Sequence, residues 1–206
     1  AEQFQKYMGK RLISLGYITG DVLNMDGHSI KLFSRKEMKA SYLSKDKAYG
    51  KAIRTFYTQD QASKKPLFAK VAYSGATVAQ VTPQLVEANK EILDGPFLSV
   101  NDKEWFIGSL LDQLDKIHGI QVLLPLKRSA KRIREMEAIA FEEFKYRYEN
   151  QPIARLVTEL DDFTGKMKLF VKRNSDGTFF ALITNKKYFR AARAMEFYQK
   201  RWGIEN

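Results

Sequence analysis

The stretch Phe97-Leu-Ser-Val-Asn-Asp102 begins the most regular part of the sequence. Its first four residues form a short apolar run typical of a strand, directly after the chain-breaking residues Asp94-Gly95-Pro96. The apolar residues of Trp105–Ile117 are spaced for a helix, and Ile120–Leu126 is the clearest pattern of a buried strand in the chain. Strands that alternate with a helix predict an α/β layered sheet.

Upstream of Phe97 the sequence predicts three further extended segments and two helices. The first helix covers residues 1–16, whose apolar positions are spaced for one face: Phe4, Tyr7, Met8, Leu12 and Leu15. The second helix is Val78–Leu93, and residues 34–50 are polar and basic and predict a loop. The extended segments are Val22–Phe33 with an irregularity at Asp26-Gly27, and the hairpin formed by Ala52–Tyr57 and Leu67–Tyr73. Because short turns join these segments, we expect antiparallel neighbours in a mixed sheet.

Downstream of Leu126 the pattern changes to a basic and then β-rich segment. A basic stretch leads into a helical run that ends near Phe144. Three strand-like runs follow, and Asp176-Gly177 between the last two is a strong hairpin signal; the runs are Ala154–Leu160, Lys168–Lys172 and Thr178–Thr184. The sequence closes with a helical pattern that begins near Lys187.

Composition limits the classes of protein to which the chain can belong. It has 206 residues, of which 44% are hydrophobic and 29% charged, as in ordinary globular proteins. The apolar runs are too short to span a bilayer, and the first residues lack the pattern of a secretory signal. The absence of cysteine excludes disulfides and thiolate metal sites.

Charge indicates the kind of partner. A net charge of +11 and an isoelectric point near 9.6 favour a polyanion, because neutralising phosphates releases counterions. On charge alone, a basic protein without such a partner is the alternative. An anionic membrane surface is disfavoured, since no predicted helix combines a dense basic face with a broad aromatic one.

The last residues form a motif with chemical potential, Tyr198-Gln-Lys-Arg201-Trp202-Gly-Ile-Glu205, which has the pattern Y-x2-R-x3-E. On a helix, its phenol, guanidinium, indole and carboxylate fall within a ~100° arc of one face. Such a face can hold a metal ion through the carboxylate and a phosphate through the guanidinium. The alternative is an amphipathic helix in which Arg201 and Glu205 merely pair at i, i+4.

Two upstream aspartates complete the pattern: Asp26 follows one apolar run and Asp102 follows another. Together with Glu205 they resemble the D-D-E triad of cut-and-paste DNA transposases, in the bacterial branch that carries the Y-x2-R-x3-E signature. The resemblance extends, in the order of that family, over Val22–Gly27, Leu98–Glu104, Phe180–Asn185 and Tyr198–Glu205. It implies an α/β fold of the RNase H-like class, in which helices flank a mixed sheet and a β-rich insertion precedes the final catalytic helix.

In that fold the first aspartate lies on the first strand, the second just past the fourth, and the glutamate on a late helix. Asp26 and Asp102 are therefore expected on adjacent central strands. Residues 1–126 would form the first part of the core, residues 127–185 the insertion with its basic helix and strands, and residues 186–206 the catalytic helix that returns to the core.

By the same resemblance, Asp26, Asp102 and Glu205 are both the catalytic residues and the metal ligands. Phosphoryl transfer on DNA requires two divalent ions about 3.5–4 Å apart, one at the nucleophile and one at the leaving oxygen. Mg²⁺ prefers carboxylate oxygens, so two Mg²⁺ ions are implied, with Mn²⁺ as an alternative. The residues alone leave other acids open, including Asp94, Glu104, Asp161 and Asp162.

Two sets of residues are expected to bind DNA. The resemblance implies that Tyr198 and Arg201 grip the phosphate near the transferred strand end, while Trp202 either stacks on DNA or packs in the core. The basic stretch after Leu126 is the expected contact with the DNA backbone, with a solvated charged face as the alternative; it contains Lys127, Arg128, Lys131 and Arg132. His28 is expected to be structural.

The function implied is that of a DNA transposase, which hydrolyses a phosphodiester at the transposon end so that the freed 3′-hydroxyl attacks target DNA. The partners implied are transposon ends, target DNA and a second copy of the chain, as a homodimer in a synaptic complex, with no membrane. The expected location is the cytoplasm of a bacterium or archaeon, associated with the nucleoid, or the nucleus for a eukaryotic derivative. Two alternatives stay open: a transposase-derived DNA-binding protein without catalysis, and an RNase H-like nuclease.

The family signature continues with a lysine beyond the glutamate, whereas this sequence ends at Asn206, directly after Glu205. We therefore expect the native protein to continue past this residue.

Overall fold

The computed structural model describes residues 1–33, 37, 40–43, 47–73 and 75–201. The chain divides into two units, Ala1–Pro96 and Phe97–Asn206. The division follows a helix that ends at Leu93, where Asp94 caps the helix in the left-handed conformation (φ 51°). A left-handed cap with proline soon after it is a common helix end, so the chain turns where the sequence predicts.

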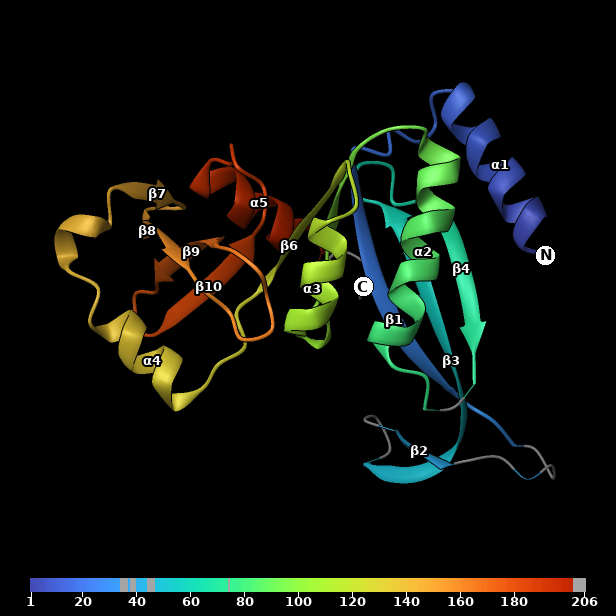
Figure 1. Cartoon of the computed structure of the whole chain (residues 1–206), viewed down its shortest axis with the longest axis horizontal. Coiled ribbons are helices and arrows are strands. Elements are labelled where there is room, and N and C mark those ends of the chain that lie inside the picture. Colours follow the sequence, from blue (N-terminus) through green and yellow to red (C-terminus); the bar gives the residue numbers. More distant parts are fainter. Residues whose placement is uncertain (34–36, 38–39, 44–46, 74, 202–206) are drawn as a thin grey trace. The chain divides into compact units, whose positions relative to one another are not determined.

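The first unit is built on an antiparallel sheet whose central strand is β3 (Ala48–Asp60) (Figure 1). Strand β1 (Val22–Lys31) and strand β4 (Pro66–Ala72) both pair with it, and β2 (Ala40–Leu43) pairs with its first residues. The predicted hairpin and the antiparallel neighbours are confirmed. The predicted irregularity at Asp26-Gly27 is wrong, because β1 runs through both residues and Gly27 pairs in register with Phe56.

One face of β3 forms the core of this unit under the helix α2 (Val78–Leu93). The even-numbered residues Ala52, Phe56, Thr58 and Asp60 are fully buried. Thr58 Oγ1 donates a 2.9 Å hydrogen bond to Asn89 Oδ1 of α2, which identifies the covered face. A capping box of Thr77 and Gln80 begins the helix, and its bounds are those predicted from the helical spacing.

The helix α1 (Glu2–Ser14) contacts α2 and β4 through a face that the apolar spacing did not predict. Gly9 is its buried residue, and a Cβ there would lie 2.8 Å from Cγ2 of Ile92 in α2. This close approach therefore depends on glycine. The predicted face is largely exposed instead, with Phe4 at 67% and Tyr7 at 66%.

Residues 34–50, predicted as a loop, include strand β2 and the first residues of β3 in the part of the chain that the structure describes. The loop prediction is wrong for Ala40–Leu43 and for residues 48–50. A strand forms here because pairing between β2 and β3 satisfies the backbone hydrogen-bonding groups.

The second unit contains a mixed sheet with the strand order β5, β6, β10, β9, β8, β7. The strands β5 and β6 are parallel, and the other neighbouring pairs are antiparallel. All four residues of β5 are buried, as in a strand covered on both faces. The strand bounds are Phe97–Val100 for β5, Ile120–Pro125 for β6, Tyr146–Tyr148 for β7, Gln151–Thr158 for β8, Met167–Arg173 for β9 and Phe179–Thr184 for β10.

Helices flank this sheet, so the expected α/β class is confirmed. Helix α3 (Gly108–Asp115) packs on β6, and α5 (Ala191–Arg201) packs on β5 to β8. The predicted β-rich segment holds α4 (Ala130–Glu137), the short helix η2 (Phe141–Glu143) and four strands, and its last strand pairs with β6. The domain limits expected from the sequence, residues 1–126, 127–185 and 186–206, stay a prediction.

The helix predicted over Trp105–Ile117 is interrupted. The short helix η1 (Lys103–Trp105) ends at a fully buried tryptophan, and α3 begins only at Gly108. A Cβ at Gly108 would collide with the backbone carbonyl of Asp161, so the start of α3 is fixed by this close approach. None of the helices that the structure describes has the length and apolar character needed to cross a membrane.

Asp60, at the end of β3, joins two turns of the first unit. Its side chain is fully buried. Oδ1 accepts hydrogen bonds from the Gly20 N–H at 3.0 Å and from Thr19 Oγ1 at 3.2 Å, and Oδ2 accepts one from the Ser63 N–H at 2.8 Å. Thr19 and Gly20 lead into β1, and Ser63 lies in the turn between β3 and β4, so one carboxylate fixes the entry of β1.

We expect Asp60→Ala to lower the free energy of unfolding by about 3 kcal/mol, because it leaves three donors without their acceptor in a buried place. Urea denaturation followed by circular dichroism measures the difference. Asp21→Ala is the matched control, since Asp21 is an exposed neighbour of Gly20, and it should cost less than about 0.5 kcal/mol. Equal stability of the two variants would contradict this role of Asp60.

Candidate active site

Asp26 is half-buried on the face of β1 that points away from α2. It lies directly opposite Tyr57 of β3, whose hydroxyl donates a 3.2 Å hydrogen bond to Asp26 Oδ2. The N–H of Gly27 donates to Asp26 Oδ1 at 2.8 Å. Two donors therefore orient the carboxylate, and the remaining lone pairs of its oxygens stay available for a cation.

Gly27 makes this arrangement possible. It points to the core face, where a Cβ would lie 3.2 Å from Cε1 of Phe56 and 3.3 Å from a guanidinium nitrogen of Arg54. Any larger residue would have to displace the Phe56 ring or the Arg54 side chain. The sequence Asp26-Gly27 thus combines an outward carboxylate with an inward position where a side chain would be packed tightly against Phe56 and Arg54.

Asp102 lies at the first turn after the C-terminal end of β5. Its neighbour Asn101 is fully buried, donates its N–H to Leu123 O at 2.9 Å, and accepts a 2.6 Å hydrogen bond from Ser99 Oγ through Oδ1. Asp102 itself caps η1 and accepts a hydrogen bond from the N–H of Lys103. The half-buried carboxylate is thus attached to a rigid strand end, the usual location of ligand-binding groups in such sheets.

A cleft of about 650 Å³ in the second unit brings most of the other predicted residues together. Asp102, Tyr198, Arg201, Lys127 and Arg128 all line it. They come from the end of β5, the end of β6 and the helix α5, and the remaining walls are Lys103, Pro125, Leu126, Met136, Phe179, Phe180 and Ala181. One acid, one buried arginine and three further cations thus share a single concave surface.

Helix α5 positions the tyrosine and the arginine of the terminal motif. Tyr198 is 6% exposed and Arg201 is 3% exposed. The Tyr198 ring packs on Phe180 of β10 with the ring centroids 5.4 Å apart, and the Arg201 guanidinium carbon lies 5.4 Å from the Tyr198 centroid. The aromatic pair therefore holds the guanidinium at the wall of the cleft.

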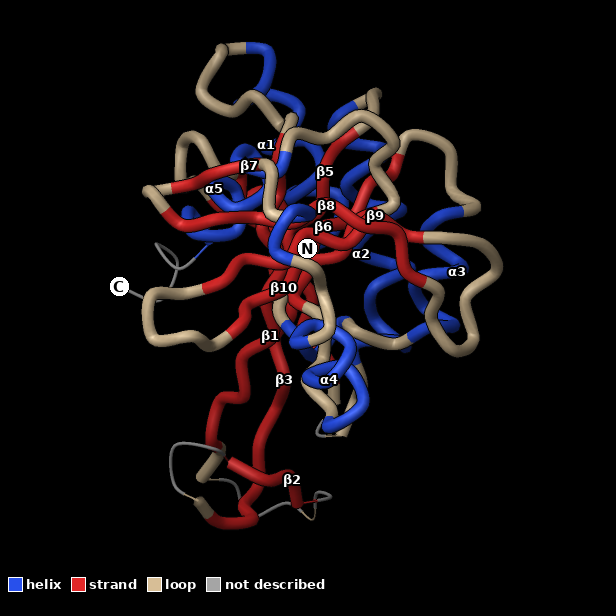
Figure 2. The backbone as a smooth tube through the Cα atoms, turned by 90° about the vertical axis from the view of Figure 1, so that its left-hand side faces the viewer, coloured by secondary structure: helices blue, strands red, loops and turns tan. Residues whose placement is uncertain are grey.

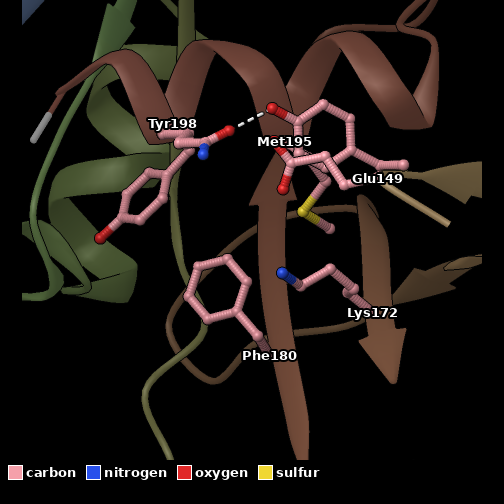
Figure 3. A pocket seen from close by; sticks show the side chains of 7 residues that line it. Glu149, Lys172, Phe180, Met195 and Tyr198 are labelled. Atoms are coloured by element: carbon pink, nitrogen blue, oxygen red, sulfur yellow. Dashed lines mark hydrogen bonds between the residues drawn. The ribbon is translucent and has the colours of Figure 1, made fainter. Parts of the chain in front are cut away.

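A smaller pocket of about 290 Å³ shares Phe180 and Tyr198 with the cleft (Figure 3). Glu149, Lys172 and Met195 complete the walls that Figure 3 labels, and Lys172 Nζ lies 5.9 Å from the Phe180 centroid. Tyr148, also in the wall, donates a hydrogen bond to Gln199 Oε1. Burial and the nearby Glu149 raise the pKa of Tyr148.

The predicted basic stretch divides between two surfaces. Lys127 and Arg128 line the cleft with Asp102, whereas Lys131 and Arg132 of α4 line a separate cavity together with acids. Arg132 donates to Glu135 at 2.9 Å and to the Glu159 carbonyl at 3.0 Å. Its guanidinium is therefore engaged within the protein, and the DNA-backbone contact expected from the sequence stays a prediction.

Trp202 and Glu205 lie outside the described residues, so their predicted roles stay predictions. The arrangement of Asp26 and Asp102, which belong to different units, also stays a prediction. Within residues 1–201, as far as the structure describes them, no group of three His, Cys, Asp or Glu side chains is placed to hold a metal. By donor type, the two aspartates nevertheless fit Mg²⁺ or Mn²⁺, which prefer oxygen ligands.

Sequence reasoning missed Tyr57, Asn101 and Phe180. Tyr57 meets Asp26 only through the register of β1 and β3, which no short turn fixes because many residues separate the two strands. Asn101 directly precedes Asp102, and a polar residue at the end of an apolar run is a signal that could have found it. Phe180 has no such signal, since its contact with Tyr198 depends on how α5 packs.

Comparison with solved structures identifies the fold. The structure of the piggyBac transposase synaptic complex with hairpin DNA matches 90% of this chain at a TM-score of 0.57 and 12% identity. Two complexes of the Mos1 transposase match less of the chain: the paired-end complex with the left transposon end covers 59% (TM-score 0.36, 15% identity), and the mariner paired-end complex with Mn covers 61% (TM-score 0.34, 16% identity). No protein-family model matches the chain, and no curated protein matches its sequence.

The piggyBac likeness confirms the expected RNase H-like fold. The chain spans only 39% of the piggyBac protein and 41% and 42% of the two Mos1 chains. The bacterial type of transposase and the Y-x2-R-x3-E signature stay predictions.

We expect α5 to contribute a pH-dependent part of the stability. Glu196 pairs with Lys200 and Arg193, each at 2.7 Å, and these hydrogen bonds lower the pKa of its carboxyl below the ordinary value of 4.5. A lowered pKa stabilises the fold above pH 4.5, and this contribution is lost as the pH falls through the folded-state pKa. Glu196→Gln should thus cost about 0.5 kcal/mol at pH 7 and nothing in acid.

Thermal or urea unfolding between pH 3 and 7 checks this expectation. Glu142→Gln, at an exposed glutamate of η2, is the control and should show no such pH-dependent difference. A Glu196→Gln deficit that persists unchanged at pH 3 would rule out the ion pairs as its cause.

Proposed function

We propose that this chain is the catalytic part of a metal-dependent DNA transposase of the D-D-E type. Asp26, Asp102 and Glu205 are its metal-binding carboxylates, and Tyr198 and Arg201 bind the reacting phosphate. The proposal includes the bacterial branch with the Y-x2-R-x3-E signature, cut-and-paste transposition, and a homodimer that holds transposon ends and target DNA.

The observation that carries the proposal is the cleft of about 650 Å³ around Asp102. Three of its five predicted residues, Asp102, Tyr198 and Arg201, were selected by resemblance to one family pattern, and Lys127 and Arg128 were selected separately as part of a basic stretch. Their convergence on one surface is not required by the helices and strands alone, so it supports a common role. The fold shared with piggyBac adds support of a coarser kind.

Each residue of the cleft has a task that suits its chemistry. Arg201 is buried and held by Tyr198, so its planar guanidinium is preorganised to bind two phosphate oxygens. Lys127 and Arg128, at the wall, neutralise neighbouring phosphates of the DNA strand. Attraction by these cations is needed because the carboxylates alone would repel a polyanion.

The carboxylates of Asp26, Asp102 and Glu205 would hold the divalent ions, which when bound would activate the attacking oxygen and stabilise the leaving one. In the first step, water attacks the phosphorus and the bond to the 3′-oxygen breaks, which leaves a 3′-hydroxyl and a 5′-phosphate. In the second step, that 3′-hydroxyl attacks a target phosphodiester and releases a 3′-hydroxyl of the target. Tyr57 and Gly27 keep the Asp26 carboxylate in a fixed direction throughout.

The test uses the full-length protein, Mg²⁺ or Mn²⁺, a donor plasmid that contains the DNA flanking its gene, and a target plasmid. Joined donor–target products support the transposase. Cleavage without joining favours the nuclease, and binding without cleavage favours the silent DNA-binding protein. Asp26→Asn, Asp102→Asn and Glu205→Gln should each lower cleavage by about a thousandfold or more.

Glu104→Gln is the matched control for these variants, because Glu104 is an exposed acid two residues from Asp102. It should retain the cleavage rate of the unmodified protein. Full activity in any one of the three triad variants would remove that residue from the proposed site.

The division of the basic stretch leads to a separate expectation for DNA binding. Lys127→Gln with Arg128→Gln should lower the slope of log K against log[salt] by about two, because two phosphate contacts are lost. Lys131→Gln with Arg132→Gln should change the slope less, since Arg132 forms an ion pair with Glu135, whereas Arg128 donates to the neutral carbonyl of Phe179. Fluorescence anisotropy with a labelled duplex measures both slopes, and an equal loss in the two variants would refute the division.

A further inference from the structure

The first unit carries an arm formed by β1 and β3. Pairing between β3 and β4 ends at Arg54, which lies opposite Ala72. From Ile53 back to Ala48, the described neighbours of β3 are only β1 and then β2. Figures 1 and 2 show the two strands leading away from α2 and β4 toward β2. We use the name "arm" for the described residues 28–33 and 47–55.

One face of the arm is continuous with Asp26. Directly opposite residues of antiparallel strands share a face, and every second residue returns to it. From the pair Asp26 and Tyr57, this face continues through His28 with Thr55 and Ile30 with Ile53. Along β3 it then reaches Lys51 and Tyr49, and Tyr49 is 77% exposed. The other face holds Ala52 and Phe56, which are fully buried.

The arm lies in the most basic part of the sequence. Residues 31–54 contain eight Lys or Arg and two acids, a net charge of +6 within a chain whose total is +11. Among the arm residues, Lys31 and Lys47 are exposed and Lys51 is partly exposed. Four of these cations belong to the described arm, Lys31, Lys47, Lys51 and Arg54, and the arm contains no acid, so its charge favours a polyanion as the partner.

We infer that the Asp26 face of the arm is a track for duplex DNA that leads away from the reacting phosphate. Lys51 neutralises a phosphate on this track, and Tyr49 packs against the sugar-phosphate backbone. Lys47, in the turn just before β3, adds an exposed cation at the far end of the arm. This inference rests on the proposed function, because it takes Asp26 as part of the catalytic site. It adds a DNA-binding surface that the cleft around Asp102 does not include.

The length of the strands gives the position of the contact on DNA. Lys51 is six residues from Tyr57 along β3, and a strand rises about 3.3 Å per residue, so Lys51 lies about 20 Å from Asp26. One DNA strand advances about 3.4 Å per nucleotide. The track therefore meets the DNA about six nucleotides from the scissile phosphate.

The first measurement is the salt dependence of binding to a fluorescein-labelled duplex of arbitrary sequence, which suits contacts to the backbone. Lys47→Gln with Lys51→Gln should lower the slope of log K against log[salt] by about two. The matched control is Lys10→Gln with Lys90→Gln, at exposed lysines of α1 and α2 in the same unit, which should leave the slope unchanged. Equal thermal unfolding temperatures of both variants and the unmodified chain establish that the fold is retained.

The second measurement uses the absence of cysteine from the chain. Lys51→Cys carries the only thiol, to which an iron–EDTA reagent is attached, and Lys90→Cys serves as the control. Lys51→Cys should cleave the bound duplex and Lys90→Cys should not. On DNA that the protein itself nicks, the cleavage should centre about six nucleotides from the nick.

The outcomes separate this inference from the proposed function. If the unmodified chain neither binds nor cleaves DNA, both proposals fail. The second outcome is that the unmodified chain binds and cleaves DNA, the variant Lys47→Gln with Lys51→Gln keeps the slope of the control, and Lys51→Cys leaves the duplex intact. In that case only the arm inference is overturned.

Discussion

The two-residue alternation of side chains along β1 and β3 is the constraint on which the first unit and its acid depend. Leu23, Met25 and Phe56 are completely buried on the face under α2, so the intervening Asp26 has to point to the other face. A slip of one residue would turn Met25 to solvent and Asp26 into the core, at a cost of several kcal/mol for the buried charge. Core packing, and not an ion pair, therefore determines the direction of the carboxylate.

In the second unit the direction of an aspartate is also fixed by the fold, but at the end of a strand instead of within one. Strand β5 is covered on both faces, so no polar side chain can point outward along its length. Asp102 is available only because it follows the strand, and buried Asn101 fixes the exit through its bonds to Ser99 and Leu123. Both aspartates are thus positioned by the fold before any cation binds, which reduces the reorganisation that binding requires.

The sequence predicts well the elements whose local pattern agrees with their packing. Val78–Leu93 and Phe97–Val100 have the predicted bounds, because caps, chain breaks and apolar spacing all indicate the same limits. The predictions that were wrong share one cause: each element depends on a tertiary contact that the local sequence pattern does not indicate. Gly9 brings α1 against Ile92, Gly108 lies against the backbone of Asp161, and β2 is a strand because β3 lies beside it.

For the candidate site, too, the sequence predicted residues that belong to a local motif and missed those that only tertiary contacts bring to the site. Asp102, Tyr198 and Arg201 were selected by resemblance to a family pattern and line one cleft, whereas Tyr57 was missed because only strand register brings it to Asp26. The net charge indicated a polyanion but not where it would bind. That depends on the partner of each cation within the fold: Arg132 forms an ion pair with Glu135, whereas Arg128, in the cleft, donates to the neutral Phe179 carbonyl, and Lys47 lies exposed on the arm. A count of basic residues therefore predicts the class of partner, and only the packing of each cation predicts the path that the partner takes.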